Sequence, residues 1–244
     1  MLATSSPSRS AASETPSTAE PVSRFPSFDE DELLAMSEPV RVDPGGVRLE
    51  GRLFGSGDVG VALAHMGAGD QSEWWGLAGL LAGEGYLVVT YNRRGNCPGG
   101  DRGCSSGDAT GGWKDLAPIV DLLRAEGADR VVVGGASQGA MESLYALSQG
   151  LDADGLIWVA GVDLYQGVRV TEQVEGVRVP KLLLAGEFDD EAAALLPELE
   201  AAAPPPTEAV LVETGEHGTD ILAFGDVEDA DAFRQAVLDF LAGI

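Results

Sequence analysis

The sequence is poor in positive charge and has no long apolar run. Lysine occurs only at Lys114 and Lys181, and Lys and Arg together number 15 against 40 acidic residues, which gives a formal net charge of -25. Binding to nucleic acid or to an anionic membrane surface requires clustered positive charge, so neither partner is expected. No apolar stretch reaches the ~18–20 residues that a membrane-crossing helix needs, so no membrane span is expected.

Cysteine is also scarce. Cys97 and Cys104 are separated by six residues in the glycine-rich segment NCPGGDRGCSSG. A zinc site needs about four ligands and no histidine lies nearby, so no metal is expected. Two alternatives stay open, a small disulfide that this flexible loop could close and a pair of free thiols. We favour the disulfide, which would indicate an oxidising compartment.

Residues 1–27 are rich in Ser, Thr, Pro and Ala and contain almost nothing that could be buried. Such a segment cannot offset the entropy lost on ordering, so we predict a disordered tail followed by one domain over residues 28–244. The tail lacks the apolar core of a signal peptide, but its composition is similar to the tether left after removal of an export signal. With the expected disulfide, this favours an exported or cell-envelope location over a cytoplasmic one, without deciding it.

Strand-like and helix-like segments alternate from residue 38 onward. The runs 39–43 and 46–54 predict an antiparallel hairpin that turns at Pro44-Gly45-Gly46. Continuous apolar runs predict six further strands, at 60–65, 86–92, 130–135, 155–161, 181–186 and 209–213. Helices are predicted between and after them, at 73–83, 113–126, 141–148, 190–202 and 227–241. Strands that are apolar on both faces and alternate with helices indicate an α/β fold, with a mostly parallel sheet covered on both sides.

The segment Gly135-Ala136-Ser137-Gln138-Gly139 lies between a predicted strand and a predicted helix. A sharp turn from strand to helix needs small residues two before and two after its central residue, and it exposes that residue at the end of the strand. Ser137 is therefore the candidate nucleophile, and helix capping is the alternative role. A nucleotide-binding loop is disfavoured, because an alanine replaces the second glycine of the dinucleotide fingerprint and no Gly-Lys-Ser/Thr follows.

A nucleophilic serine needs a base, and the chain has two histidines. His217 follows the last strand in the turn GEHG, from which it could reach Ser137, whereas His65 ends an apolar strand and is expected to be structural. Asp189, three residues after Gly186, is the preferred acid to orient His217. The alternatives are Asp163, after the preceding strand, and the neighbours Glu187 and Asp190. The order Ser, Asp, His along the chain fits the arrangement known for strand-to-helix nucleophile turns.

Negative charge that develops on a substrate carbonyl needs backbone donors. One is expected from the N–H of Gln138, which follows the candidate nucleophile. The other is expected from the turn after the first core strand, at Gly67 or Met66, with Gly67 preferred.

The ordered set of motifs resembles the α/β-hydrolase superfamily. Besides the elements above, the set includes a tryptophan-containing helix after His65 and a Tyr-Asn-Arg-Arg-Gly segment at 91–95, and it covers residues 46–243. The resemblance implies a Ser137–Asp189–His217 triad, an oxyanion hole of two backbone amides and no cofactor. Met66 departs from the pattern, because a glycine usually follows the strand histidine, and the Cys97–Cys104 loop lengthens the segment after Arg94.

Fewer than twenty residues separate the strands that end at 161 and begin at 181, which is too short for the helical lid that lipases of this superfamily place there. We therefore expect an open site and a small-molecule substrate, a neutral short-chain carboxylic ester cleaved as by a carboxylesterase or a dienelactone-hydrolase-like enzyme. A peptidase or an acyltransferase on the same fold is the alternative, and a non-catalytic binding protein is a more distant one. The sequence does not indicate an oligomeric state.

Overall fold

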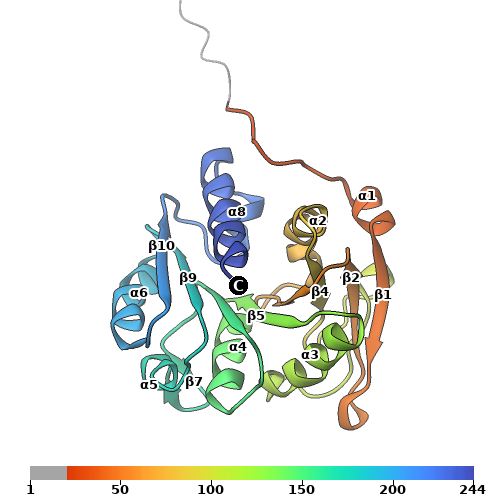
Figure 1. Ribbon diagram of the computed structural model, residues 1–244, viewed down its shortest axis with the longest axis horizontal. Coiled ribbons are helices and arrows are strands. Elements are labelled where there is room, and N and C mark those ends of the chain that lie inside the picture. The colour runs from red at the N-terminus through yellow and green to blue at the C-terminus, as the bar shows by residue number, and fades with distance from the viewer. Residues whose placement is uncertain (1–20) are drawn as a thin grey trace, which may run out of the picture.

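The computed structural model describes residues 21–244, and its centre is an eight-stranded sheet (Figure 1). Its strands, in spatial order, are β1 (Ser37–Val42), β2 (Leu49–Phe54), β4 (Leu87–Tyr91), β3 (Val59–Ala64), β5 (Arg130–Ala136), β6 (Gly155–Val159), β9 (Lys181–Gly186) and β10 (Thr207–Val212). β1 and β2 pair antiparallel, β2 pairs antiparallel with β4, and all later neighbours are parallel. The predicted α/β fold with an N-terminal hairpin is confirmed.

The apolar strand sequences are explained by layers of helix on both faces. Every residue of β3, β4, β6 and β9 is buried. The helices that cover the sheet are α2 (Trp75–Gly83), α3 (Leu116–Ala125), α4 (Gln138–Ser148), α6 (Asp190–Ala202) and α8 (Val227–Ala242). Figure 1 shows α2 and α8 on one face, with α3, α4 and α6 on the other.

The strand order determines where functional side chains can gather. From β3 the chain crosses through α2 to β4 on one side, then returns through α3 to β5 on the other side of β3. Such a reversal leaves a crevice at the carboxyl ends of the strands. In the parallel register Ala64 lies opposite Gly135, so the turn after β3 and the turn after β5 are direct neighbours.

Several short elements differ from the predictions. α4 begins at Gln138, whereas the sequence predicted a start at residue 141, and α2 and α3 each follow a 3₁₀ turn, at Gln71–Trp74 and Gly112–Asp115. Further 3₁₀ turns lie at Pro44–Gly46 and Gly100–Arg102. The sequence did not predict α1 (Glu30–Ala35), the hairpin of β7 (Leu164–Tyr165) and β8 (Val168–Arg169), α5 (Val170–Val174) or α7 (Asp220–Ala223). The longest of these elements, α1, has six residues, whereas a helical hydrophobic pattern is recognised over a window of about 11–18 residues.

The segment between β6 and β9 contains the β7–β8 hairpin and the five-residue helix α5. α5 packs beside α4 and α6. Among residues 21–244, none of the helices combines the length and the apolar character needed to cross a bilayer.

Most of the predicted tail, residues 1–20, lies outside the described residues. The rest of it contacts the domain: the Ser23 hydroxyl donates to Asp231 Oδ1 at 2.6 Å, the Arg24 N–H donates to Oδ2 at 2.9 Å, and Phe25 packs against the core. Residues 23–25, which fall within the predicted tail, therefore contact α8 and the core.

Asp231, on α8, holds this N-terminal segment, and we expect Asp231→Ala to loosen it. Burial alone would raise the pKa of this carboxyl, but the hydrogen bonds from Ser23 and Arg24 and the ion pair with Arg234 lower it. Loss of hydrogen bonds to a charged group should cost about 1–3 kcal/mol of unfolding free energy. The melting temperature, measured by calorimetry near neutral pH, should fall by several degrees, and an unchanged value would contradict the role.

Candidate active site

Ser137 occupies a strained position between β5 and α4. Its backbone angles are φ 50° and ψ -116°, a conformation that residues other than glycine rarely adopt. Two backbone hydrogen bonds hold it there, from its own N–H to the Val159 carbonyl at 2.8 Å and from the Met141 N–H to its carbonyl at 3.2 Å. Strain that is held in this way is typical of functional sites.

The glycines that flank the serine are required by their surroundings. A Cβ added to Gly135 would lie 2.6 Å from the Ala64 carbonyl oxygen, and one added to Gly139 would lie 2.3 Å from the same atom. Both contacts are with backbone, which cannot move aside as a flexible side chain would. The small residues at the predicted spacing therefore allow α4 to begin directly against the end of β3, with Ser137 partly exposed at the helix N-terminus.

His217 and Asp189 are brought together from two loops. His217 Nδ1 lies 2.6 Å from Asp189 Oδ2, and the Asp189 side chain is only 12% exposed. A proton on Nδ1 donated to the carboxylate leaves Nε2 as the basic nitrogen. The rival acid Asp163 instead pairs with Arg169 at 2.9 Å. The site therefore contains an oriented imidazole at the carboxyl end of the sheet.

Backbone contacts fix the two loops against each other. We call residues 213–219, between β10 and α7, the histidine loop. The Glu187 N–H donates to the Val212 carbonyl at 2.7 Å and the Phe188 N–H to the Thr214 carbonyl at 2.9 Å. A Cβ on Gly186 would lie 2.7 Å from the Thr214 carbonyl oxygen, so glycine there permits the close approach.

No hydrogen bond joins Ser137 to His217 within residues 21–244. The histidine loop nevertheless lies beside the serine, since a Cβ on Gly218 would be 3.2 Å from the Ala136 side chain. Such hydrogen bonds are often long without substrate and tighten when it binds.

The candidate oxyanion donors also lie together. We call residues 65–69 the oxyanion turn. The Met66 N–H donates to Glu73 Oε2 at 3.2 Å and is thus occupied. Gly67 is exposed, and a Cβ on it would lie 3.2 Å from Gln138 Oε1. Gly67 therefore lies beside the Gln138 side chain, whereas the Met66 N–H already has a partner.

His65 is fully buried and has both ring nitrogens occupied. Its Nδ1–H donates to the Met66 carbonyl at 2.6 Å, and Nε2 accepts from the Arg93 N–H at 3.1 Å. Burial, with the nearby Arg93 charge, lowers its pKa to about 4. A neutral, enclosed imidazole supports the predicted structural role.

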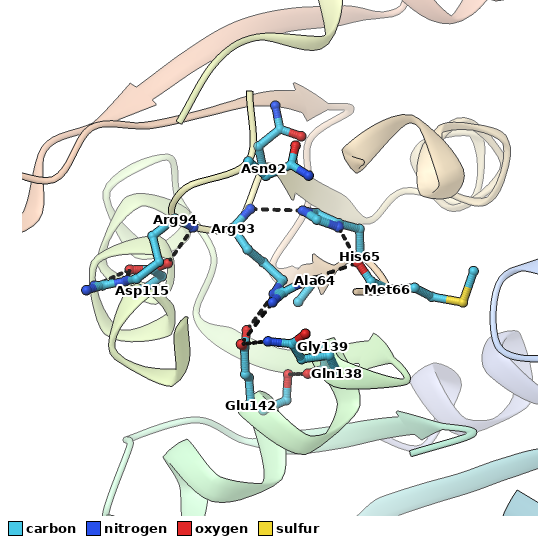
Figure 2. Close-up of polar contacts among 12 residues, drawn as sticks. Ala64, His65, Met66, Asn92, Arg93, Arg94, Asp115, Gln138, Gly139 and Glu142 are labelled. Atoms are coloured by element: carbon cyan, nitrogen blue, oxygen red, sulfur yellow. Dashed lines mark hydrogen bonds and ion pairs between the residues drawn. The ribbon is translucent and has the colours of Figure 1, made fainter. Parts of the chain in front are cut away.

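The sequence did not reveal a buried network beneath this site (Figure 2). The Arg93 guanidinium donates to both Glu142 carboxylate oxygens, at 2.8 and 3.2 Å, and to the Met66 carbonyl at 3.1 Å. Glu142 Oε1 also accepts from Gln138 Nε2 at 3.1 Å. One ion pair thus joins the oxyanion turn, the chain after β4 and the first turn of α4.

The loop that contains the two cysteines supports the oxyanion turn from outside. Cys97 and Cys104 are joined by a disulfide. The Asn96 side chain donates to the Gly69 carbonyl at 2.8 Å, and the Gln71 side chain donates to the Arg102 carbonyl at 2.7 Å. The lengthened segment therefore packs beside the turn.

Comparison with known proteins identifies the fold. No family model and no curated protein sequence matches the chain. A predicted CIB-like hydrolase from Thermoplasma acidophilum is 22% identical, with a TM-score of 0.67, over 85% of this chain and 99% of that one. An esterase from Pyrococcus furiosus is 17% identical, with a TM-score of 0.71, over 94% and 99%. A thermophilic esterase from Thermogutta terrifontis is 17% identical, with a TM-score of 0.65, over 84% and 98%. The chain has the α/β-hydrolase fold.

The Arg93–Glu142 pair is expected to be costly to break. Both side chains are almost fully buried, so Glu142→Ala leaves a guanidinium without its partner. The expected loss in unfolding free energy, measured by denaturant titration, is about 3–5 kcal/mol. The double variant Arg93→Met, Glu142→Leu should recover much of it, because no charge is then left unpaired. A double variant less stable than Glu142→Ala would contradict this.

Proposed function

We propose that this chain is a serine hydrolase that cleaves small, neutral short-chain carboxylic esters. The observation that carries the proposal is the arrangement at the carboxyl edge of the sheet, where a strained serine at a helix N-terminus lies near a histidine oriented by a partly buried carboxylate. Positive φ at the serine and two glycines pressed against Ala64 are the features that a sharp strand-to-helix turn with an exposed nucleophile requires. The similar folds described as esterases add support.

In the proposed reaction, His217 Nε2 takes the proton of the Ser137 hydroxyl as Oγ attacks the ester carbonyl. Asp189 keeps the imidazole in the required tautomer and stabilises the imidazolium that forms. The N–H groups of Gln138 and Gly67 stabilise the oxyanion. The imidazolium then protonates the departing alcohol. Water attacks the acyl-enzyme by the same route, releasing the carboxylic acid and restoring Ser137.

The preference for neutral, short substrates follows from charge and shape. A net charge of -25 lowers the local concentration of anionic substrates and of anionic lipid surfaces. The segment between β6 and β9 provides only a small hairpin and one short helix, which pack beside α4 and α6. This segment would therefore bury little of a long acyl chain.

Replacement of the proposed nucleophile gives the first test. Ser137→Ala should keep the fold and lower the turnover of p-nitrophenyl acetate by several powers of ten, because the members of a triad act as a unit. Turnover is measured on protein whose circular dichroism and melting temperature match the wild type. Retained activity in a clean preparation would exclude Ser137.

The role of Asp189 as the acid that orients His217 can be tested against Asp163 as a matched control. Asp189→Asn should cut turnover strongly, because the amide no longer holds His217 in the required tautomer. Asp163→Asn should change it little, since Asp163 pairs with Arg169. The reverse outcome would place the acid on the loop after β6.

Substrate length provides a separate prediction. Each acyl-chain methylene that becomes buried contributes about 0.8 kcal/mol of binding free energy. Because an open site buries few of them, longer acyl chains should not raise kcat/KM. We expect kcat/KM to be highest for acetyl to butyryl p-nitrophenyl esters, without a rise at the solubility limit. A preference for chains of ten or more carbons would show that exposed side chains such as Phe188 and Phe224 form an acyl-binding surface.

A further inference from the structure

The Glu73 carboxylate bridges two loops of the site. Its Oε2 accepts from the Met66 N–H and from the Thr219 hydroxyl, each at 3.2 Å. Met66 belongs to the oxyanion turn, and Thr219, which is 2% exposed, ends the histidine loop two residues after His217. One oxygen atom therefore ties the turn that carries the candidate donor Gly67 to the loop that carries the candidate base.

Glycine makes room for this bridge. A Cβ on Gly69 would lie 1.3 Å from Glu73 Oε1, so no side chain can occupy position 69 while the carboxylate is in place. A second contact runs parallel to the bridge, because a Cβ on Gly218 would lie 2.6 Å from Met66 Sδ. The two loops thus pack directly on each other at two points.

The surroundings of Glu73 would disfavour its ionised carboxylate if that carboxylate had no hydrogen-bond donors. Burial raises the pKa of its carboxyl, and the hydrogen bonds from Met66 and Thr219 oppose that shift. The facing charged groups are Asp70 and Asp220, which raise the pKa further, and Arg234 across a cavity that Glu73 also lines. Within residues 21–244 the carboxylate is held by its two donors and forms no ion pair.

We propose that Glu73 is a positioning residue, which sets the distance between the oxyanion turn and His217. This inference rests on the function proposed above. Glu73 touches neither the reacting atoms nor the candidate nucleophile and acts through Met66 and Thr219. It occupies the Met66 N–H, which leaves the Gly67 N–H to face the oxyanion. It also holds the histidine loop at Thr219, whereas Asp189 holds the imidazole itself, so the loop and the ring are fixed by separate contacts.

The test compares Glu73→Ala, Glu73→Gln and Thr219→Val in the full chain. Two readouts are used, the rate of covalent labelling by a fluorophosphonate probe and the kcat and KM for p-nitrophenyl acetate. The side-chain oxygen of glutamine can accept from both the Met66 N–H and the Thr219 hydroxyl, as Glu73 Oε2 does, whereas alanine can accept from neither. Misplacement of catalytic groups by about 1 Å can cost about 100-fold. We expect Glu73→Ala to lower kcat and the labelling rate by about 10- to 100-fold with little change in KM.

The companion variants separate positioning from general stability. Glu73→Gln should react within about three-fold of wild type, and Thr219→Val should be slowed. Combining Thr219→Val with Glu73→Ala should add little further loss, because the two residues share one interaction. The matched control is Asp231→Ala, which also breaks a carboxylate bridge between segments. It should lower the melting temperature but not the rates.

Wild-type rates in Glu73→Ala, a Glu73→Gln variant as slow as Glu73→Ala, or fully additive losses would overturn the inference. If Glu73→Ala does not fold, Thr219→Val decides, and a wild-type rate there overturns it. A wild-type protein that the probe does not label at all would remove the proposed function and this inference together, whereas a labelled wild type with unaffected variants removes only the inference.

Discussion

The close approach of α4 to the carbonyl of Ala64 is the constraint on which the rest of the site depends. This one oxygen accepts from the Trp74 indole at 3.0 Å, and it leaves no room for a side chain at Gly135 or Gly139. Because β3 and β5 are adjacent and in parallel register there, the oxyanion turn and the first turn of α4 meet. The Arg93–Glu142 pair then fastens the two turns from below (Figure 2).

The parts of the site that could be predicted are those encoded by local sequence. The strand, turn and helix around Ser137 occupy consecutive residues, and their glycines have a steric reason that can be stated without a structure. His217 and Asp189 could be chosen because each follows a recognisable strand. The start of α4 was predicted three residues late, since Gln138-Gly139-Ala140 appears as part of the turn, whereas packing against β3 makes these residues helical.

The network beneath the site could not be predicted, because its partners are far apart in the chain. Arg93 and Glu142 are separated by 49 residues, and Glu73 and Thr219 by 146. Nothing in either segment indicates which of the 40 acidic side chains becomes buried. Three basic side chains are also buried, because Arg52, Arg93 and Lys181 are all at most 7% exposed. The Lys181 ammonium donates to the backbone carbonyls of Val179 and Pro204. Asp115, Glu142 and Asp231 are buried as well, so among residues 21–244 burial removes equal numbers of cations and anions and leaves the net charge of the surface unchanged.

Ser137 is the proposed nucleophile at this edge of the sheet, and locating a covalent adduct tests that proposal most directly. Native protein treated with a fluorophosphonate should gain the mass of one probe molecule less hydrogen fluoride, and tandem mass spectrometry of the digested protein should place the adduct on Ser137. An adduct on any other residue, or none on folded protein, would contradict the account.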